Sequence, residues 1–338
     1  MTTLPPPIRA YRTLGPELLE DLRRSGYQRI ALQVPAGLSM SARSYAEEIT
    51  RATGASVVLV ARACFGACDP PARAEVPGAE ALVALGHAPI PNMPVSMPMY
   101  LAEMRLGKAD PARVAETLVA AHLPSRVGLV ASIQHLDDLP PVIEALGARG
   151  IEAQIARGPP RLAYPGQALG CNYSSATALE EKVHGFVFLG TGRFHPLGLA
   201  LSVERPVWAL DPLQMLLEGP FDRQGMINRR LLEIERAMDA KVWGVLVSSL
   251  AGQSRGALAR RLVGKAEARG REAMVITFDR LFPADLLGRG VDAYVSTACP
   301  RIATDDGTSY DRPILTPPEF LSAIGERPLM PYLFDAFP

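Results

Sequence analysis

Three of the four cysteines in this chain have a spacing that suits a metal centre. Cys68, Cys171 and Cys299 are separated by 103 and 128 residues, and each lies past the carboxyl end of an expected β-strand. Because thiolate sulfur is a soft ligand, three such side chains brought together can bind a soft metal centre. Three protein ligands leave one coordination position open, and an open position is where a metal centre does chemistry.

The sequence around each of these cysteines favours an iron–sulfur cluster over zinc. The segments 66–69, 170–174 and 298–301 place glycine or alanine next to each cysteine. Small neighbours let a bulky inorganic cluster approach the backbone, whose N–H groups can bond its sulfurs. A zinc site is not indicated, because the sequence has no C-x2-C pair and no histidine close to a cysteine. Buried structural thiols are the alternative interpretation.

The fourth cysteine, Cys64, precedes Cys68 in a C-x3-C pair. No third cysteine follows within a few residues, so the loop of three closely spaced cysteines found in the usual radical enzymes is absent. We interpret Cys64 as a structural thiol. A fourth ligand from Cys64 would close the site, which would weaken the argument for catalysis.

The elements expected to position the cysteines repeat three times along the chain. Each repeat has an apolar run, a helical stretch that ends at a glycine, and a second apolar run. These ranges are 30–34, 39–52 and 56–60, then 127–131, 136–149 and 151–155, then 242–247, 256–269 and 272–278. The glycines are Gly54, Gly150 and Gly270, which suits helix ends that need a positive φ. Short strands alternating with helices predict βαβ units and parallel sheets.

A third apolar run follows in each repeat, at 81–85, 186–189 and 291–295, and 206–210 adds a fourth strand to the second repeat. We therefore predict an α/β fold of three related domains, 1–115, 116–220 and 221–338, with one of the three cysteines in each. Ligands bind at the carboxyl edge of parallel strands, so we expect a pseudo-threefold arrangement of the domains around a central cluster. One continuous doubly wound sheet is the alternative.

Composition narrows the class of protein. The 338 residues are 48% hydrophobic and 21% charged, as in compact globular proteins, and the formal net charge is zero. Without an excess of basic residues, we expect no nucleic-acid partner. No apolar stretch of about 18 residues occurs, and the first ten residues carry no signal core, so we expect no membrane segment and a cytoplasmic location. Thiols stay reduced there, which favours metal binding over disulfides.

Several segments together resemble the archaeal diphthamide synthase family, over about residues 25 to 320. They are 33–38, 65–69, Gly86-His87, 169–171, Gly252-Gln253, and Ser-Thr-Ala-Cys-Pro-Arg-Ile-Ala at 296–303 followed by Asp305. The last is the most specific. The resemblance implies three related α/β domains in which Cys68, Cys171 and Cys299 bind a [4Fe–4S] cluster, and a homodimer.

The resemblance also implies an activity. The enzyme of the first step in diphthamide biosynthesis breaks the bond between sulfur and Cγ of S-adenosylmethionine by radical chemistry. It transfers the 3-amino-3-carboxypropyl group to a histidine of translation elongation factor 2, and an electron donor must supply the reducing electron. The cluster drives this cleavage, so we expect no catalytic acid or base. His87 and His195, which follow strands in glycine-rich loops, are interpreted as structural.

Three further residues are candidates for binding S-adenosylmethionine. Arg301 follows a proposed ligand by two residues and suits a carboxylate. Gln253 offers a side-chain amide after a strand, and Asp305 suits an amine. Each has an ordinary alternative: a surface arginine for Arg301, a turn for Gln253 and a helix cap for Asp305.

Two competing functions remain open from the sequence. Quinolinate synthase is a dehydratase that also builds a [4Fe–4S] site from three α/β repeats with one cysteine each, although its local motifs fit poorly here. The other is a non-catalytic subunit that passes electrons or holds a partner. Fold alone does not separate these functions.

Overall fold

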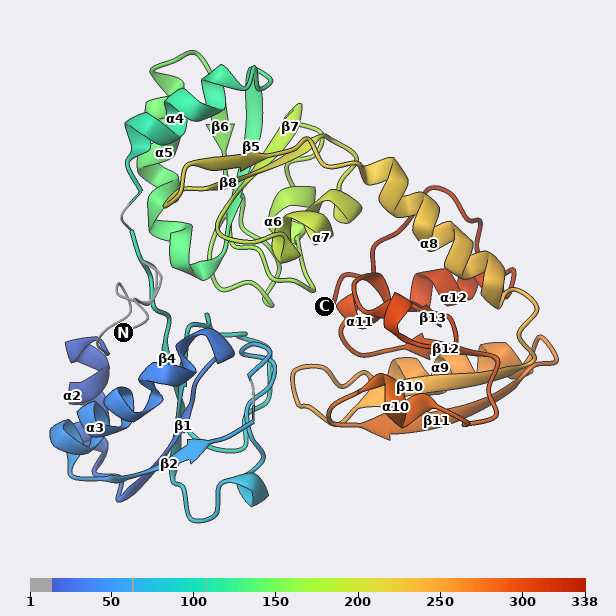
Figure 1. The fold of residues 1–338 in the computed structure, drawn as a ribbon, viewed down its shortest axis with the longest axis horizontal. Coiled ribbons are helices and arrows are strands. Elements are labelled where there is room, and N and C mark those ends of the chain that lie inside the picture. The colour runs from blue at the N-terminus through green and yellow to red at the C-terminus, as the bar shows by residue number, and fades with distance from the viewer. Residues whose placement is uncertain (1–13, 63, 108) are drawn as a thin grey trace.

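The computed structural model describes residues 14–62, 64–107 and 109–338. These form three separate, mostly parallel sheets that surround a common middle (Figure 1). The sheet orders are β2-β1-β3-β4, β6-β5-β7-β8-β9 and β11-β10-β12-β13. In each sheet the unit's first strand therefore lies between its second and third. The predicted α/β fold with three parallel sheets is confirmed, and one continuous sheet is excluded.

The three units contain the following elements. The first has α2 (Pro16–Ser25), β1 (Arg29–Gln33), α3 (Ala42–Thr53), β2 (Ser56–Val60), β3 (Ala81–Leu85) and β4 (Met99–Ala102). The second has α4 (Pro111–Ala120), β5 (Arg126–Ala131), α5 (Leu139–Gly147), β6 (Glu152–Gln154), α6 (Ser174–Thr177), β7 (Gly185–Leu189), α7 (Phe194–Ser202), β8 (Val207–Asp211) and β9 (Leu216–Glu218). The third has α8 (Arg223–Ala237), β10 (Val242–Ser248), α9 (Gly256–Glu267), β11 (Glu272–Phe278), α10 (Pro283–Leu286), β12 (Ala293–Ser296), α11 (Arg301–Thr304), β13 (Ile314–Leu315) and α12 (Pro317–Ala323).

The expected strands are present, and the structure adds three that the pattern did not indicate. Strands β4 and β13 give the first and third sheets a fourth parallel strand, while β9 is antiparallel to β8. Strand β13 has two residues, which is too short for a recognisable apolar run. The first two expected helices each begin one turn late, after 3₁₀ helices at Ala36–Ser41 and Ile133–Asp138.

Helices cover the sheets and bury the faces of their central strands. In the first unit, Leu22 of α2 and Tyr45 of α3 pack against Ile30 of β1. In the second unit, α4 and α5 cover one face and α6 and α7 the other. Burial of both faces explains why these strands read as continuous apolar runs in the sequence. The carboxyl ends of the strands are thereby held at fixed positions.

Two segments pack against a unit other than the one that the proposed domain boundaries give them to. Helix α4 spans residue 115 and packs with α5 against the second sheet. After α12, Tyr332 and Phe334 join the core of the second unit. We propose that the second unit begins before Pro111 and that the last residues of the chain return to it from the third.

A buried ion pair fixes α8 to the third unit. The Arg230 guanidinium donates to both carboxylate oxygens of Glu319 at 2.8 Å and to the carbonyls of Ala303 and Ile314. The Tyr332 hydroxyl also donates to Glu319, at 2.9 Å. Burial alone would raise the pKa of Glu319, but the charge of Arg230 and these hydrogen bonds outweigh it and lower the pKa. The carboxylate is therefore ionised in the folded state.

Replacing Glu319 with glutamine should lower the free energy of unfolding by about 3 kcal/mol, because Arg230 is left buried without its counter-charge. Urea denaturation at neutral pH measures this. The matched control is Glu326→Gln, which removes a more exposed pair with Lys265 and should change the free energy by less than about 1 kcal/mol. Because the folded pKa of Glu319 is lowered, the wild-type contribution should persist to below the ordinary value of 4.5. Equal losses in both variants would contradict a special role for this pair.

Within the described residues, no helix is long and apolar enough to cross a lipid bilayer.

Candidate metal centre

One cavity of about 290 Å³ is lined by all three of the cysteines singled out from the sequence. Cys68 lies in the loop after β2, and Cys299 follows the end of β12 by three residues. Cys171 follows Gln167, which pairs with Ala131 at the end of β5. Each unit therefore supplies one thiol from the carboxyl edge of its sheet, which is where open α/β sheets bind ligands.

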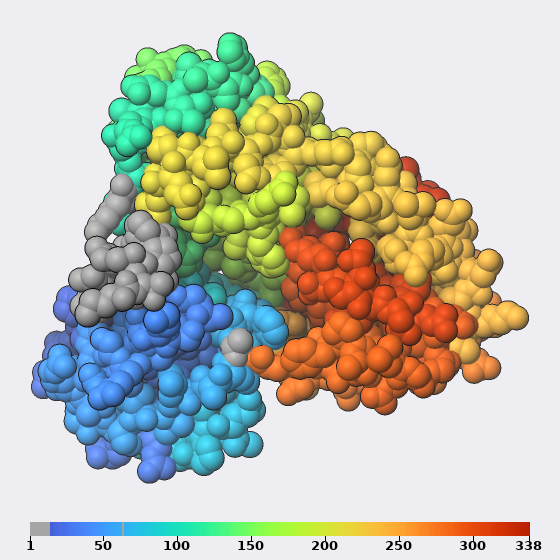
Figure 2. All heavy atoms as spheres, viewed as in Figure 1, coloured from blue at the N-terminus to red at the C-terminus, as the bar shows by residue number. Residues whose placement is uncertain are grey.

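The three units lie against one another in the space-filling view (Figure 2), and hydrogen bonds join them near this cavity. The backbone N–H of Gly252 donates to the carbonyl of Cys68 at 3.1 Å, which joins the third unit to the first. A Cβ atom on Gly252 would lie 2.4 Å from Cα of Cys68, so only glycine permits this approach. The Gln134 side-chain amide donates to the carbonyl of Gly86 at 2.8 Å, which joins the second unit to the first.

Two side chains donate hydrogen bonds to the cysteine sulfurs. Nε2 of Gln253 lies 3.4 Å from Sγ of Cys68, and Nε of Arg161 lies 3.4 Å from Sγ of Cys171. The same guanidinium donates from Nη2 to the carbonyl of Gly252 at 2.9 Å. Donors of this kind stabilise negative charge on ligand sulfurs and orient them. Arg161 thereby links the cysteine loop of the second unit to the third unit.

The last residues of the chain complete this linkage. The Phe337 ring lies between two guanidinium groups, 4.1 Å from that of Arg161 and 4.5 Å from that of Arg255. The backbone N–H of Phe337 donates to the carbonyl of Cys171 at 2.8 Å, and the Asn172 side chain donates to the carbonyl of Phe337 at 2.8 Å. This end of the chain lies at the middle of the three units in Figure 1.

Arg255 ties the same segment to the third cysteine loop. Its guanidinium donates to the carbonyls of Thr297 and Ala298, at 2.6 and 3.1 Å, just before Cys299. It also pairs with the Asp335 carboxylate, at 2.9 Å from Nη1. Arg161, Arg255 and the Phe337 ring therefore connect the Cys171 and Cys299 loops, and Gly252 extends this linkage to the Cys68 loop.

Burial controls the acidity of the thiols. Burial, followed by the nearby Cys171, raises the pKa of Cys68 to about 11, although the Gln253 hydrogen bond acts in the opposite direction. Burial and Cys171 also raise the pKa of Cys299. Thiolates packed this closely repel one another, so deprotonating all of them requires a cationic centre between them. Among the described residues, no three His, Cys, Asp or Glu side chains form a group that could hold a single metal ion. The donor set instead suits a multinuclear cluster, which spans its ligands more widely.

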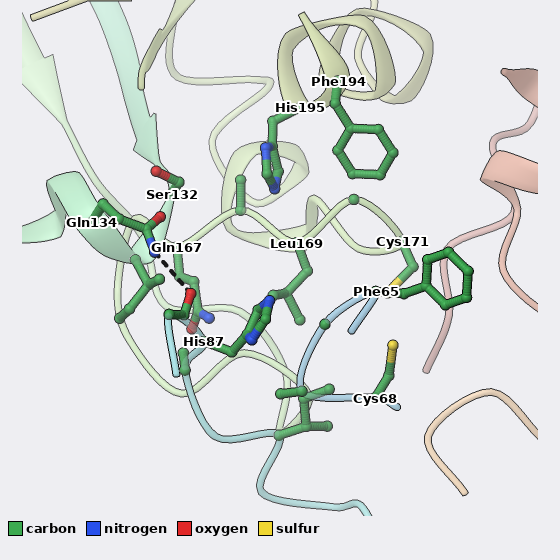
Figure 3. Close-up of a pocket in the computed structure, with 18 of the residues that line it drawn as sticks. Phe65, Cys68, His87, Ser132, Gln134, Gln167, Leu169, Cys171, Phe194 and His195 are labelled. Atoms are coloured by element: carbon green, nitrogen blue, oxygen red, sulfur yellow. Dashed lines mark hydrogen bonds between the residues drawn. The ribbon is translucent and has the colours of Figure 1, made fainter. Parts of the chain in front are cut away.

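Apart from the cysteines, the cavity wall is mostly apolar and has a few uncharged polar side chains. It contains His87, His195, Gln134 and Gln167, and no Asp, Glu, Lys or Arg among the described residues lines it. Burial lowers the pKa of both His87 and His195 to about 4, so both imidazoles are neutral at neutral pH. Nε2 of Gln167 is buried and has no hydrogen-bond partner within the described part of the chain. Figure 3 shows these side chains facing the cavity.

The three candidates for S-adenosylmethionine binding lie around the centre but do not line this cavity. Gln253 contacts Cys68, as described above. Arg301 is buried, pairs with Asp305, and donates to the carbonyl of Phe194 at 2.7 Å. Cys64 does not line the cavity either. Its Sγ donates to the carbonyl of Gly66 at 3.4 Å.

Comparison with known proteins agrees with a three-unit α/β protein built around a thiol-bound cluster. The family model of diphthamide synthesis proteins matches residues 34–332. The chain therefore belongs to the diphthamide synthesis protein family.

Individual relatives match along most of their length. The 2-(3-amino-3-carboxypropyl)histidine synthase of Pyrococcus horikoshii is 36% identical over 316 residues, which cover 92% of this chain and 90% of that protein. Subunit 1 of the corresponding synthase from Gallus gallus is 28% identical, covering 92% of this chain and 76% of that protein. The crystal structure of Dph2 from Pyrococcus horikoshii with a 4Fe-4S cluster superposes with a TM-score of 0.86 at 35% identity, covering 94% of this chain and 92% of that chain.

Proposed function

We propose that this chain is a 2-(3-amino-3-carboxypropyl)histidine synthase, a transferase of the first step of diphthamide biosynthesis. It holds a [4Fe–4S] cluster through Cys68, Cys171 and Cys299 and uses S-adenosylmethionine as donor of the 3-amino-3-carboxypropyl group. The acceptor is a histidine of translation elongation factor 2. The observation that carries this proposal is the single cavity lined by one thiol from each of three units.

When bound, such a cluster would supply one electron to the sulfonium of S-adenosylmethionine, so that the bond from sulfur to Cγ breaks into methylthioadenosine and the 3-amino-3-carboxypropyl radical that is transferred. Apart from the three cysteines, the residues described along the cavity wall are neutral, so the chain places no competing charge beside this cation. Negative charge is then concentrated at the three thiolates and the inorganic core they hold. Coulomb attraction in this buried site favours a sulfonium placed next to the sulfurs.

The roles of individual residues follow from their contacts. We propose that Gln253 orients Cys68 and meets the bound S-adenosylmethionine from the same side. Arg301 and Asp305 form an ion pair in the structure. We propose that this pair binds the carboxylate and the amine of S-adenosylmethionine. No general base is required for cleavage by electron transfer.

Further properties belong to the same proposal. We propose that the protein is a homodimer, works in the cytoplasm, and receives electrons from a separate donor. Membership of the diphthamide synthesis family favours this function over quinolinate synthase. The remaining alternative is a non-catalytic subunit. Such a chain, assayed alone, would form no product from S-adenosylmethionine.

The test is an anaerobic assay of the purified chain with dithionite, S-adenosylmethionine and translation elongation factor 2. The holoenzyme should be brown and contain about four irons per chain. It should form methylthioadenosine and add one aminocarboxypropyl group to the factor, detected by mass spectrometry. Formation of 5′-deoxyadenosine as the main product would contradict the proposed bond cleavage, and absence of turnover by the lone chain would support the non-catalytic subunit.

A further inference from the structure

Two exposed aromatic rings lie at the mouth of the cysteine cavity. Phe65 is 64% exposed and Phe194 is 47% exposed, yet both line the same cavity as the three thiols. Figure 3 shows both rings beside Cys171, with Ser132 and Gln134 on the opposite side of the cavity. Large aromatic side chains left open to solvent beside a cavity mark a binding surface rather than a packed core.

An arginine fixes each ring from one side. The Arg280 guanidinium carbon lies 5.0 Å from the centroid of the Phe65 ring, and that of Arg301 lies 4.3 Å from the centroid of Phe194. Arg301 also donates to the carbonyl of Phe194 at 2.7 Å, so it anchors both ring and backbone. A cation on one face orients an aromatic ring and leaves its remaining surface for another group.

The loop of Cys171 makes room for one of these rings. A Cβ atom on Gly170 would lie 2.2 Å from Cε1 of Phe194, so the ring rests directly on the glycine next to the cysteine. The Phe194 ring also meets His195 edge to face, with centroids 5.1 Å apart. The position of the ring next to a proposed ligand is therefore fixed by packing on two sides.

We infer that Phe65 and Phe194 form a stacking site for the imidazole ring that accepts the transferred group. This inference rests on the proposed function and assigns its acceptor site. The acceptor histidine is carried on a protein and reaches the cavity from solvent, so it meets the exposed rings at the mouth. Apart from the three cysteines, the described lining of the cavity behind them is uncharged and mostly apolar, which suits a neutral heteroaromatic ring.

Adenine of S-adenosylmethionine is the other planar heterocycle in the reaction, and the experiment separates the two. Phe65→Ala and Phe194→Ala holoenzymes are compared with wild type for modified elongation factor 2 formed per methylthioadenosine released. Each alanine variant should lower this ratio about tenfold and raise the KM for the factor, because a stacked ring is lost. Phe65→Tyr and Phe194→Tyr should restore both values.

The matched control is Phe282→Ala, which removes a ring of similar exposure, 59%, outside the cavity. It should leave the ratio unchanged. If methylthioadenosine and modified factor fall in parallel in the mouth variants, the rings bind adenine and the inference fails. A smaller oligomer on gel filtration, or an unchanged ratio and KM, would equally overturn it. Wild-type protein that forms neither product would instead contradict the proposed function.

Discussion

Replacing Cys68, Cys171 or Cys299 with alanine should abolish the brown colour and reduce formation of methylthioadenosine by more than about 100-fold. Each of these thiols comes from a different unit, so each loss removes one corner of the proposed centre. The two thiolates that remain would hold such a cluster weakly, because no substitute ligand is at hand. Apart from the cysteines, the only His, Cys, Asp or Glu side chains among the described lining residues are the neutral His87 and His195. Iron and sulfide analysis of the anaerobic proteins measures the loss directly.

The fourth cysteine is the control for this series. Cys64 has its own hydrogen bond to the carbonyl of Gly66, and its Sγ lies 4.0 Å from Nδ1 of His87. Burial raises the pKa of its thiol to about 12. Cys64→Ala should therefore keep its iron and most of its activity. Loss of iron from Cys64→Ala to the same extent as from Cys68→Ala would mean that four thiols close the site, which leaves no open iron for S-adenosylmethionine.

The parts of the fold predicted from the sequence are those with local signals. Gly54, Gly150 and Gly270 have φ values of 76°, 80° and 68°, as the helix-ending pattern requires. The apolar runs of the central strands reflect burial on both faces of each sheet, whereas the edge strands β2 and β11 remain partly exposed. The short strand β13 left no such signal, because its two residues are paired by tertiary context alone.

The candidate site also has some residues with a local sequence signal and others without one. Small residues around Cys68, Cys171 and Cys299 marked the loops, and the cavity brings these loops together. No pattern in the sequence indicated Arg161, although its guanidinium donates to Sγ of Cys171. Its hydrogen bond to Gly252 spans 91 positions, and that of Asn172 to Phe337 spans 165.

Contacts over such distances have no periodicity or motif, so only the folded chain reveals them. The contact between the exposed Phe194 ring and Arg301 could not be predicted either, because Arg301 comes from another unit. From its neighbours in the sequence alone, Arg161 would be interpreted as a solvent-exposed charge in a glycine- and proline-rich loop. In the fold, Arg161 is buried and contacts Cys171, Gly252 and Phe337, which are far apart in the sequence.

Removing Arg161 is the second change with a large expected effect. Arg161→Gln loses the cation beside Cys171, its hydrogen bond to Gly252, and its contact with the Phe337 ring. Residues that support metal ligands in this way typically contribute 10- to 100-fold to metal affinity or activity, so we expect iron binding to weaken by about that factor. The midpoint potential of the remaining cluster should become more negative, because a nearby cation and a donor to sulfur stabilise the reduced state.

A redox titration followed by electron paramagnetic resonance distinguishes this electrostatic role from simple packing. Arg161→Lys keeps the charge and should retain most of the potential, while it loses the two-point hydrogen bonding that a guanidinium provides. Arg157→Gln, an exposed arginine on the same loop, is the matched control and should behave like wild type. If Arg161→Gln binds iron normally at an unchanged potential, then the linkage through Gly252 and Phe337 holds the loops without it. The charge of Arg161 would then have no influence on the centre, even though its Nε lies 3.4 Å from a proposed ligand sulfur.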